Sequence, residues 1–132
     1  MKETELAQNF KRLINEKARI AKIPVFYYKI PDTGGTGGLR PFDSILLIAG
    51  KLFAIEFKVG KAKLKPHQKF CLGLIDTCGG RSVTVKDTSY KEVINDIIAG
   101  AITARDILSR LKQNFKKDGN DGLSGIHAGP IC

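Results

Sequence analysis

Two carboxylates and one ammonium group lie in or beside apolar runs in the stretch "RPFDSILLIAGKLFAIEFKVG", residues 40–60. They belong to Asp43, Glu56 and Lys58. Neighbouring carboxylates repel and raise a pKa unless a cation lies between them. Sites rich in carboxylate oxygens suit Mg²⁺, which can activate water and stabilise charge on a phosphate. An adjacent ammonium can orient that water or hold a phosphate oxygen. These residue types predict a metal site that hydrolyses phosphate esters.

The spacing brings the three side chains together if residues 49–50, Ala-Gly, form a two-residue hairpin loop. Asp43 then lies directly opposite Glu56, where paired residues point to the same face about 4.5–5.5 Å apart. Lys58 is two residues beyond Glu56 and shares its face. The pattern therefore predicts that all three charged groups meet at one end of a strand pair.

A longer loop would change this arrangement, because a shift of one residue puts Asp43 on the other face. The three residues could also be an aspartate at a strand start and a Glu–Lys pair at a sheet edge. The flanking runs "SILLI" and "LFAIEF" favour the metal site. They indicate strands buried on both faces, where an idle carboxylate is costly.

The surrounding sequence predicts one mixed α/β domain over residues 1–115, with helices flanking a mixed sheet. A Gly-rich tail, residues 116–132, is expected to be flexible. Periodicity and turn residues predict a helix over 3–20, a strand over 25–30, a flexible Gly-rich loop over 31–41, the hairpin, a helix from 66 to the glycines at 79–80, a strand over 81–86, and two C-terminal helices over 89–100 and 102–115.

Composition favours a polyanionic partner. The 132 residues carry 22 Lys and Arg against 13 Asp and Glu, a formal net charge of +9, which fits nucleic acid before an anionic membrane.

The chain lacks a signal peptide and any apolar run near the ~20 residues of a membrane span, so a cytoplasmic protein of a cell or phage is expected. Cys71 and Cys78 lie seven residues apart on one face of the predicted helix, so they are expected to be small core residues. Unpaired cysteines fit a reducing compartment.

The order of motifs resembles the PD-(D/E)XK nuclease superfamily, and more closely its small stand-alone VRR-NUC nucleases. "AIEFKVGKAKLKPHQ" is similar to the family pattern of an (I/V)E(V/F/L)K strand, a G/K-rich loop and a P-x-Q helix start. The resemblance spans residues 3 to about 86. It implies a restriction-endonuclease-like αβββαβ core with extra C-terminal helices. It also implies an Mg²⁺- or Mn²⁺-dependent endonuclease that acts on branched DNA such as Holliday junctions.

The resemblance assigns roles to the central residues. Asp43, Glu56 and the backbone carbonyl of Phe57 would bind the metal ion, and Lys58 would assist hydrolysis. The family motif usually places its aspartate directly after proline, whereas Phe42 intervenes here. The literal Pro31-Asp32 pair lies 24 residues before Glu56, which fits a turn aspartate better.

Two further residues match the family from helices. Gln68 would support the site from a helix start, although an exposed helix residue is the alternative. Glu3 shares the apolar stripe of Leu6 and Phe10, so it is expected to point toward the sheet. Its alternative role is a first-turn acid that interacts with the helix dipole.

Several basic residues surround the predicted site. They could contact phosphates or form a solvated loop, and sequence leaves this open. They are Arg40, Lys61, Lys63, Lys65 and Lys69. The family members are thought to form homodimers, and residues 88–115 could supply a dimer face or simply cover the sheet. The remaining alternatives are a non-catalytic nucleic-acid-binding module on the same fold and a nuclease that acts on RNA.

Overall fold

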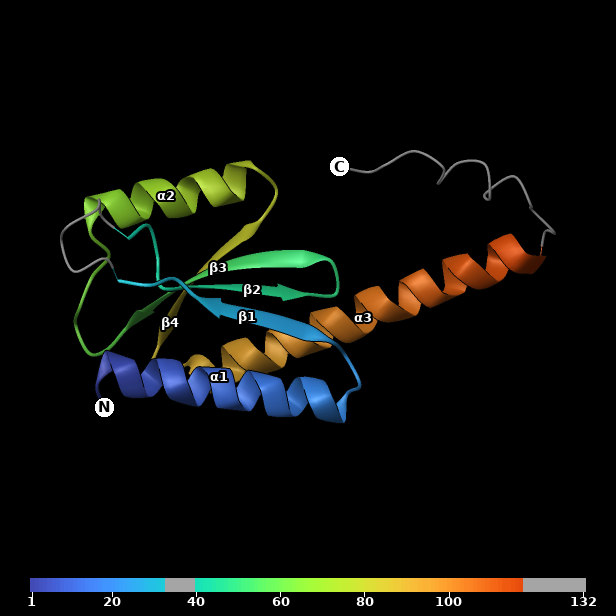
Figure 1. Ribbon diagram of the computed structural model, residues 1–132, viewed down its shortest axis with the longest axis horizontal. Helices are drawn as coiled ribbons and strands as arrows, with labels where there is room; N and C mark the ends of the chain where they lie inside the picture. Colours follow the sequence, from blue (N-terminus) through green and yellow to red (C-terminus); the bar gives the residue numbers. More distant parts are fainter. Residues whose placement is uncertain (33–39, 118–132) are drawn as a thin grey trace.

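The computed structural model describes residues 1–32 and 40–117. The loop residues 33–39 and the tail residues 118–132, for which flexibility was expected, lie outside the described residues. The elements follow in the order α1 (Glu3–Ile20), β1 (Val25–Lys29), β2 (Ser44–Ile48), β3 (Lys51–Lys58), α2 (Pro66–Thr77), β4 (Arg81–Lys86) and α3 (Tyr90–Lys117) (Figure 1). The expected α/β class is confirmed.

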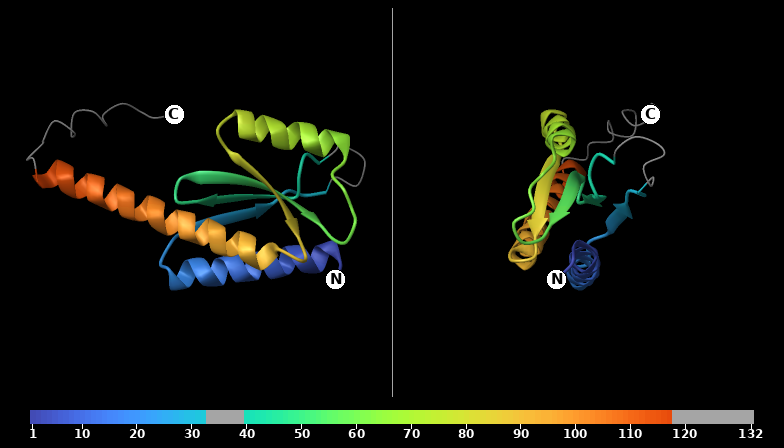
Figure 2. Two further views of the ribbon diagram at one scale, coloured as in Figure 1. Left: turned by 180° about the vertical axis from the view of Figure 1, so that it is seen from behind. Right: turned by 90° about the vertical axis from the view of Figure 1, so that its left-hand side faces the viewer.

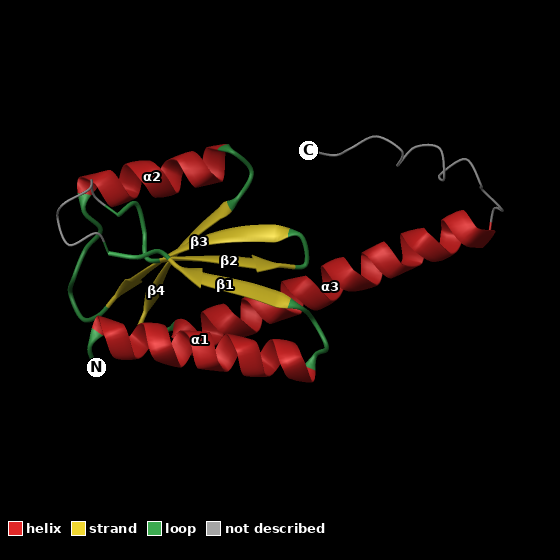
Figure 3. Ribbon diagram, in the orientation of Figure 1, coloured by secondary structure: helices red, strands yellow, loops and turns green. Residues whose placement is uncertain are grey.

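The four strands form one mixed sheet in the order β1-β2-β3-β4. Strands β1, β2 and β3 are antiparallel neighbours, while β4 runs parallel to β3. Helices α1 and α3 cover one face and α2 covers the other, as the end-on view in Figure 2 and the colouring in Figure 3 show. This places a helix on each side of the central strand β3, which accounts for the apolar runs in its sequence.

The main core lies between the sheet and helices α1 and α3. The apolar stripe of α1 supplies Leu6, Phe10 and Ile14, all fully buried. The Phe10 ring packs edge-on against Phe57 of β3, with centroids 5.4 Å apart. A smaller cluster under α2 contains Ala54 of β3. Successive β3 residues therefore face opposite helix layers, and this alternation decides which way Glu56 points.

The hairpin between β2 and β3 has the predicted two-residue loop. Ile48 pairs with Lys51, and the ladder continues to Ser44 opposite Ile55. Ala49 and Gly50 have φ values of 49° and 78°, the left-handed conformation that suits a type I′ turn. The ladder ends one position before the predicted pairing of Asp43 with Glu56, because Asp43 precedes β2 and donates its N–H to the Ile55 carbonyl instead.

The prediction of two C-terminal helices was wrong, because α3 is one continuous helix of 28 residues. Gly100, expected to end the first helix, lies inside it. A glycine ends a helix when it adopts a left-handed conformation, and Gly100 has no positive φ. Its neighbours Ile97, Ile98 and Ala101 are buried in the core, and this packing outweighs the cost of about 1 kcal/mol for an interior glycine.

Two smaller expectations also need correction. Lys116 and Lys117 continue α3, so the helix passes the predicted domain boundary at residue 115. Cys78 is exposed at the C-cap of α2 and Cys71 is half-buried, so they are not a pair of core residues.

The predicted stop signal of α2 holds, since Gly79 follows the cap with φ 93°. Within the described ranges, no helix has the length and apolarity needed to cross a membrane.

Candidate active site

Asp43 lies just before β2 and is held by both its backbone and its side chain. Its backbone N–H donates to the Ile55 carbonyl (3.0 Å), and its carbonyl accepts from the Ile30 N–H (2.9 Å). Its carboxylate Oδ2 accepts the backbone N–H of Phe57 (2.8 Å). The carboxylate is therefore fixed at the end of the strand pair, against the backbone that follows Glu56.

Glu56 is the most deeply buried carboxylate of the described chain, with only 2% of its surface exposed. Its Oε2 accepts a hydrogen bond from Gln68 Nε2 (2.8 Å) and lies 3.2 Å from Lys58 Nζ. Its Oε1 is buried and accepts no hydrogen bond, and Asp43 lies close enough for a carboxyl–carboxylate hydrogen bond when Glu56 is protonated. Burial, and then the nearby charge of Asp43, raise the pKa of Glu56 to about 7. A buried acceptor without a partner is rare and costly, and one explanation is a missing ion.

Gln68 reaches this carboxylate from the first turn of α2. Its Oε1 accepts the backbone N–H of Lys65 (2.9 Å), which satisfies a free donor at the helix start, while its Nε2 donates to Glu56. The side chain is buried, with 8% exposure. Pro66 occupies the first helical position, where its missing N–H costs nothing. The supporting role predicted for Gln68 thus has a direct contact, and the exposed-residue alternative is wrong.

Lys58 ends β3 on the same face as Glu56. Its side chain is only 9% exposed, and its ammonium lies 3.2 Å from Glu56 Oε2. A buried ammonium is stable only beside an anion or several acceptors. Lys58 and Glu56 therefore meet on one face as predicted, and the charge of Asp43 also acts on Glu56.

A cavity of about 330 Å³ opens beside this cluster, between α1 and the edge of the sheet. Asp43 and Phe57 line it, whereas Glu56 lies on the α2 side of β3 and does not. Glu3 is exposed and lines the same cavity, so α1 does bring it near Asp43. No described hydrogen bond or ion pair joins Glu3 to Asp43 or Glu56, so its part in the site stays a prediction.

Sequence reasoning missed most of the cavity residues on α1, β1 and β2, among them two lysines, a tyrosine and a serine. They are Lys11, Tyr27, Lys29 and Ser44. The Tyr27 hydroxyl and the Ser44 hydroxyl share a hydrogen bond of 2.8 Å, and burial raises the pKa of Tyr27. Lys29 pairs with Ser44 in the β1–β2 ladder. Extending the hairpin register to the preceding strand would have found Lys29, but the antiparallel partner of β2 had to be known first.

Arg40 does not project outward as a free phosphate contact. Its Nη2 lies 2.6 Å from Asp43 Oδ1, and its Nη1 donates to the Ile30 carbonyl at 3.3 Å. The guanidinium therefore neutralises Asp43 while it lines the cavity. A partly buried carboxylate is stabilised by an opposite charge close to it. Arg40, three residues before Asp43, supplies that charge.

The lysines after β3 behave differently from Arg40. Lys61, Lys63, Lys65 and Lys69 are all exposed. They lie in the connection from β3 to α2 and in the first turn of α2, and none lines the cavity. Their arrangement fits either a solvated loop or phosphate contacts outside the cavity, so the two readings stay open.

The donor atoms fit a small divalent cation. Glu56 Oε1 lacks a partner, whereas Asp43 Oδ1 is paired with Arg40, which would have to release it to a cation. Among the described residues no cluster of three or more His, Cys, Asp or Glu side chains could hold a metal ion. Mg²⁺ commonly uses one or two carboxylates and keeps several waters, so two carboxylates and a backbone carbonyl are sufficient.

Comparison with known proteins does not assign this chain to a family. No protein-family model matches the chain, and no curated protein sequence matches it either.

Proposed function

We propose that this protein is an Mg²⁺- or Mn²⁺-dependent endodeoxyribonuclease with a PD-(D/E)XK, VRR-NUC-like site. The observation that carries the proposal is the buried Oε1 of Glu56, which has no partner although it lies beside Asp43 and Lys58. A divalent cation would satisfy this oxygen and relieve the repulsion between the two carboxylates. An Asp–Glu pair with a neighbouring ammonium is a set of groups that metal-dependent hydrolysis of a phosphodiester can use.

In this proposal Asp43, Glu56 and the carbonyl of Phe57 hold the metal ion. The ion supplies Lewis-acid stabilisation of charge on the phosphate and lowers the pKa of an attacking water. Gln68 fixes the carboxylate of Glu56 through Oε2, which leaves Oε1 without a protein donor. Lys58 stabilises the developing negative charge and orients the water.

The cavity beside Asp43 gives the DNA strand its approach. Lys11 and Lys29 line its wall together with Arg40, which is paired with Asp43, so two further cations face this space. Phosphate oxygens bind such groups through charge-assisted hydrogen bonds. The net charge of +9 adds a long-range attraction to polyanions. The substrate proposed from the family resemblance is branched DNA, where two copies of the chain would cut opposite strands of a two-fold junction.

A non-catalytic DNA-binding module remains the second candidate, because Arg40 already neutralises Asp43. A guanidinium that stayed there permanently would replace the metal ion. The two candidates differ in one measurement, since only the enzyme cuts DNA when Mg²⁺ or Mn²⁺ is added.

The test compares wild type with Glu56→Gln on plasmid and four-way-junction DNA in Mg²⁺, Mn²⁺ or EDTA. Wild type should cut only with metal, and Glu56→Gln should lower the rate by on the order of a thousandfold, since the metal contributes several kcal/mol. Glu16→Gln, an exposed acid on the same chain, is the matched control and should cut like wild type.

Tight DNA binding by pure wild-type protein without cutting in either metal would support the module. Unchanged metal-dependent cutting by Glu56→Gln would refute the site. Junctions made of RNA in the same assay decide whether the substrate is DNA or RNA.

A further inference from the structure

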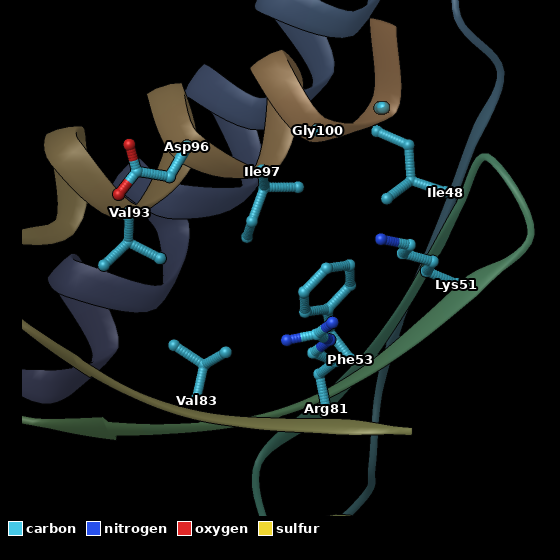
Figure 4. Close-up of a pocket in the computed structure, with 10 residues that line it drawn as sticks. Ile48, Lys51, Phe53, Arg81, Val83, Val93, Asp96, Ile97 and Gly100 are labelled. Atoms are coloured by element: carbon cyan, nitrogen blue, oxygen red, sulfur yellow. The ribbon is translucent and has the colours of Figure 1, made fainter. Parts of the chain in front are cut away.

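A cavity of about 390 Å³ lies between α3 and the starts of β3 and β4, apart from the one beside Asp43. Phe53 and Val83 line it from the sheet, and Val93 and Ile97 face them from α3 (Figure 4). Small-molecule sites commonly occupy roughly 300–1,000 Å³ and are lined mainly by apolar side chains. This cavity therefore has the size and the walls of a ligand site.

The apolar walls of the cavity are incompletely buried. Phe53, Val83 and Val93 pack against the main core, yet each is only half-buried because one side of each faces the cavity. Removing apolar surface from water is favourable roughly in proportion to its area. The walls thus favour an occupant with an apolar body.

The helix side of the cavity is kept open by a missing side chain. Gly100 lines the cavity in the interior of α3, where glycine is a poorer helix former than alanine. A Cβ atom added at Gly100 would meet no heavy atom within 4 Å, so packing against the described chain does not require glycine there. The glycine leaves space at the cavity wall that a larger residue would fill.

Two basic side chains lie at the mouth of the cavity. Lys51 lies two residues before Phe53 on the same face of β3, and Arg81 of β4 is the register partner of Phe53. Figure 4 shows the ammonium group of Lys51 pointing into the cavity and Arg81 beside the Phe53 ring. Both residues are exposed, and no hydrogen bond or ion pair within the described residues engages either side chain. Two cations without a close counter-ion therefore adjoin an apolar space.

The nearest acidic residues do not neutralise these cations. Asp96 lines the cavity from α3, on the side away from Lys51 (Figure 4). Asp76 of α2 accepts hydrogen bonds from Ser82, and these bonds, followed by the charge of Arg81, lower the pKa of Asp76. Arg81 thus acts on that carboxylate without forming an ion pair with it. A negatively charged ligand group is favoured at the sheet side of the mouth, and a positively charged one is disfavoured.

We propose that this cavity binds a small amphipathic carboxylate. The alkyl or aryl body of the ligand lies between Phe53 and Ile97. Its carboxylate accepts charge-assisted hydrogen bonds from Lys51 and Arg81 at the mouth. At ~30 Å³ for each water, the cavity has the volume of about thirteen waters, so the ligand has roughly a dozen non-hydrogen atoms. Decanoate has this size and chemistry and serves as the probe.

This site does not depend on the proposed nuclease activity. Lys51 and the cavity lie at the hairpin end of β3, whereas Glu56 lies about 17 Å further along the strand. A ligand in the cavity therefore touches neither carboxylate of the candidate active site. Binding is measured in EDTA and without DNA, so the two proposals can fail separately.

The experiment titrates decanoate into the whole chain by isothermal titration calorimetry, below the concentration at which decanoate forms micelles. Decanol and decylamine carry the same alkyl chain with a neutral or a cationic head and are the comparison probes. Wild type should bind one decanoate per chain, with a dissociation constant on the order of tens of micromolar. Decylamine should bind more weakly than decanol, and added salt should weaken decanoate but not decanol.

Lys51→Met and Arg81→Met separate the charge from the apolar contact, because methionine keeps an unbranched side chain without the cation. Each should weaken decanoate binding by roughly fivefold, since both groups are exposed and screened by solvent. Each should leave decanol binding unchanged. Lys112→Met, at an exposed lysine further along α3, is the matched control and should bind decanoate like wild type.

Gly100→Leu tests whether the ligand occupies this cavity. The added side chain should abolish binding of decanoate and decanol alike. It should also raise the midpoint of thermal unfolding by a few degrees, because leucine is a better helix former than glycine. Gly100→Ala should raise the midpoint as well but leave most of the binding. A more stable variant that has lost the ligand cannot owe that loss to misfolding.

Four results would overturn the inference. The first is no saturable binding of decanoate to wild type. The second is decylamine binding as tightly as decanoate, which would remove the role of the two cations. The third is wild-type binding by Gly100→Leu, which would place the ligand elsewhere. The last is binding only above the concentration at which decanoate forms micelles, which would assign the cavity to a lipid surface.

Discussion

Arg40 and Asp43 form an ion pair across the entrance of the candidate site, with Nη2 2.6 Å from Oδ1. The other oxygen of Asp43 accepts the N–H of Phe57. The carboxylate is thus fully engaged without a metal ion, whereas Glu56 Oε1 is left without a partner. In the proposed enzyme, Arg40 must release Asp43 when the cation binds. In that enzyme the pair would compete with the metal ion for Asp43.

Arg40→Ala should therefore lower the Mg²⁺ concentration that gives half-maximal binding. The pair is partly exposed, so its loss is worth up to about 1 kcal/mol and roughly a fivefold change. A calorimetric metal titration without DNA measures this directly. Arg12→Ala, an exposed arginine on α1, is the control. An unchanged or higher midpoint in Arg40→Ala would mean that the ion pair does not compete with metal.

Gln68→Ala should reduce both stability and cutting. It leaves the Lys65 N–H uncapped and removes a hydrogen bond from the buried carboxylate of Glu56, at a cost of about 1–3 kcal/mol. Urea unfolding measures the first effect, and junction cleavage under conditions where the variant remains folded measures the second. Gln113→Ala, at an exposed site on α3, should change neither. Wild-type cutting by Gln68→Ala would show that Glu56 needs no support from α2.

The raised pKa of Glu56, about 7, predicts how stability depends on pH without metal. In the unfolded chain a glutamate titrates near about 4.3, so between these values the folded state binds more protons. Raising the pH through this window should therefore destabilise wild type by up to roughly 3 kcal/mol. Glu56→Gln should lack this contribution.

The measurement is chemical unfolding in EDTA across that pH window, with the wild-type curve compared with Glu56→Gln. Parallel curves would contradict the raised pKa. Above pH 7 the deprotonated carboxylate is ready for a cation, so added Mg²⁺ should recover part of the lost stability.

The hairpin loop offers a test of the register that joins the two carboxylates. Ala49 has φ 49°, a conformation that costs a residue with a side chain roughly 1 kcal/mol, whereas glycine adopts it freely. Ala49→Gly should therefore raise the free energy of unfolding by a few tenths to about 1 kcal/mol after the entropy of glycine is counted. Gly50→Ala, at φ 78°, should lower it by about 1 kcal/mol. Equal signs in urea unfolding would contradict the two-residue turn.

The local sequence was sufficient for the hairpin and the helix start that hold the site. The Ala-Gly pair between two apolar runs specifies a two-residue turn, and the turn fixes which residues of β2 and β3 are opposite each other. Short-range rules therefore pair Ser44 with Ile55 and bring the adjacent Asp43 and Glu56 near each other. The Pro66 and Gln68 positions likewise follow from the requirements of a helix N-terminus.

The tertiary structure decided the rest. Gly100 looked like a helix stop, but core packing on both sides keeps α3 continuous. Arg40 looked like a free phosphate contact, but it lies against Asp43. The lysines on α1 and β1 reach the cavity only because the sheet places those elements beside β2. Turns and caps involve residues a few positions apart, so sequence specifies them. Burial, ion pairing and cavities depend on residues far apart in the chain, and only the folded structure brings these together.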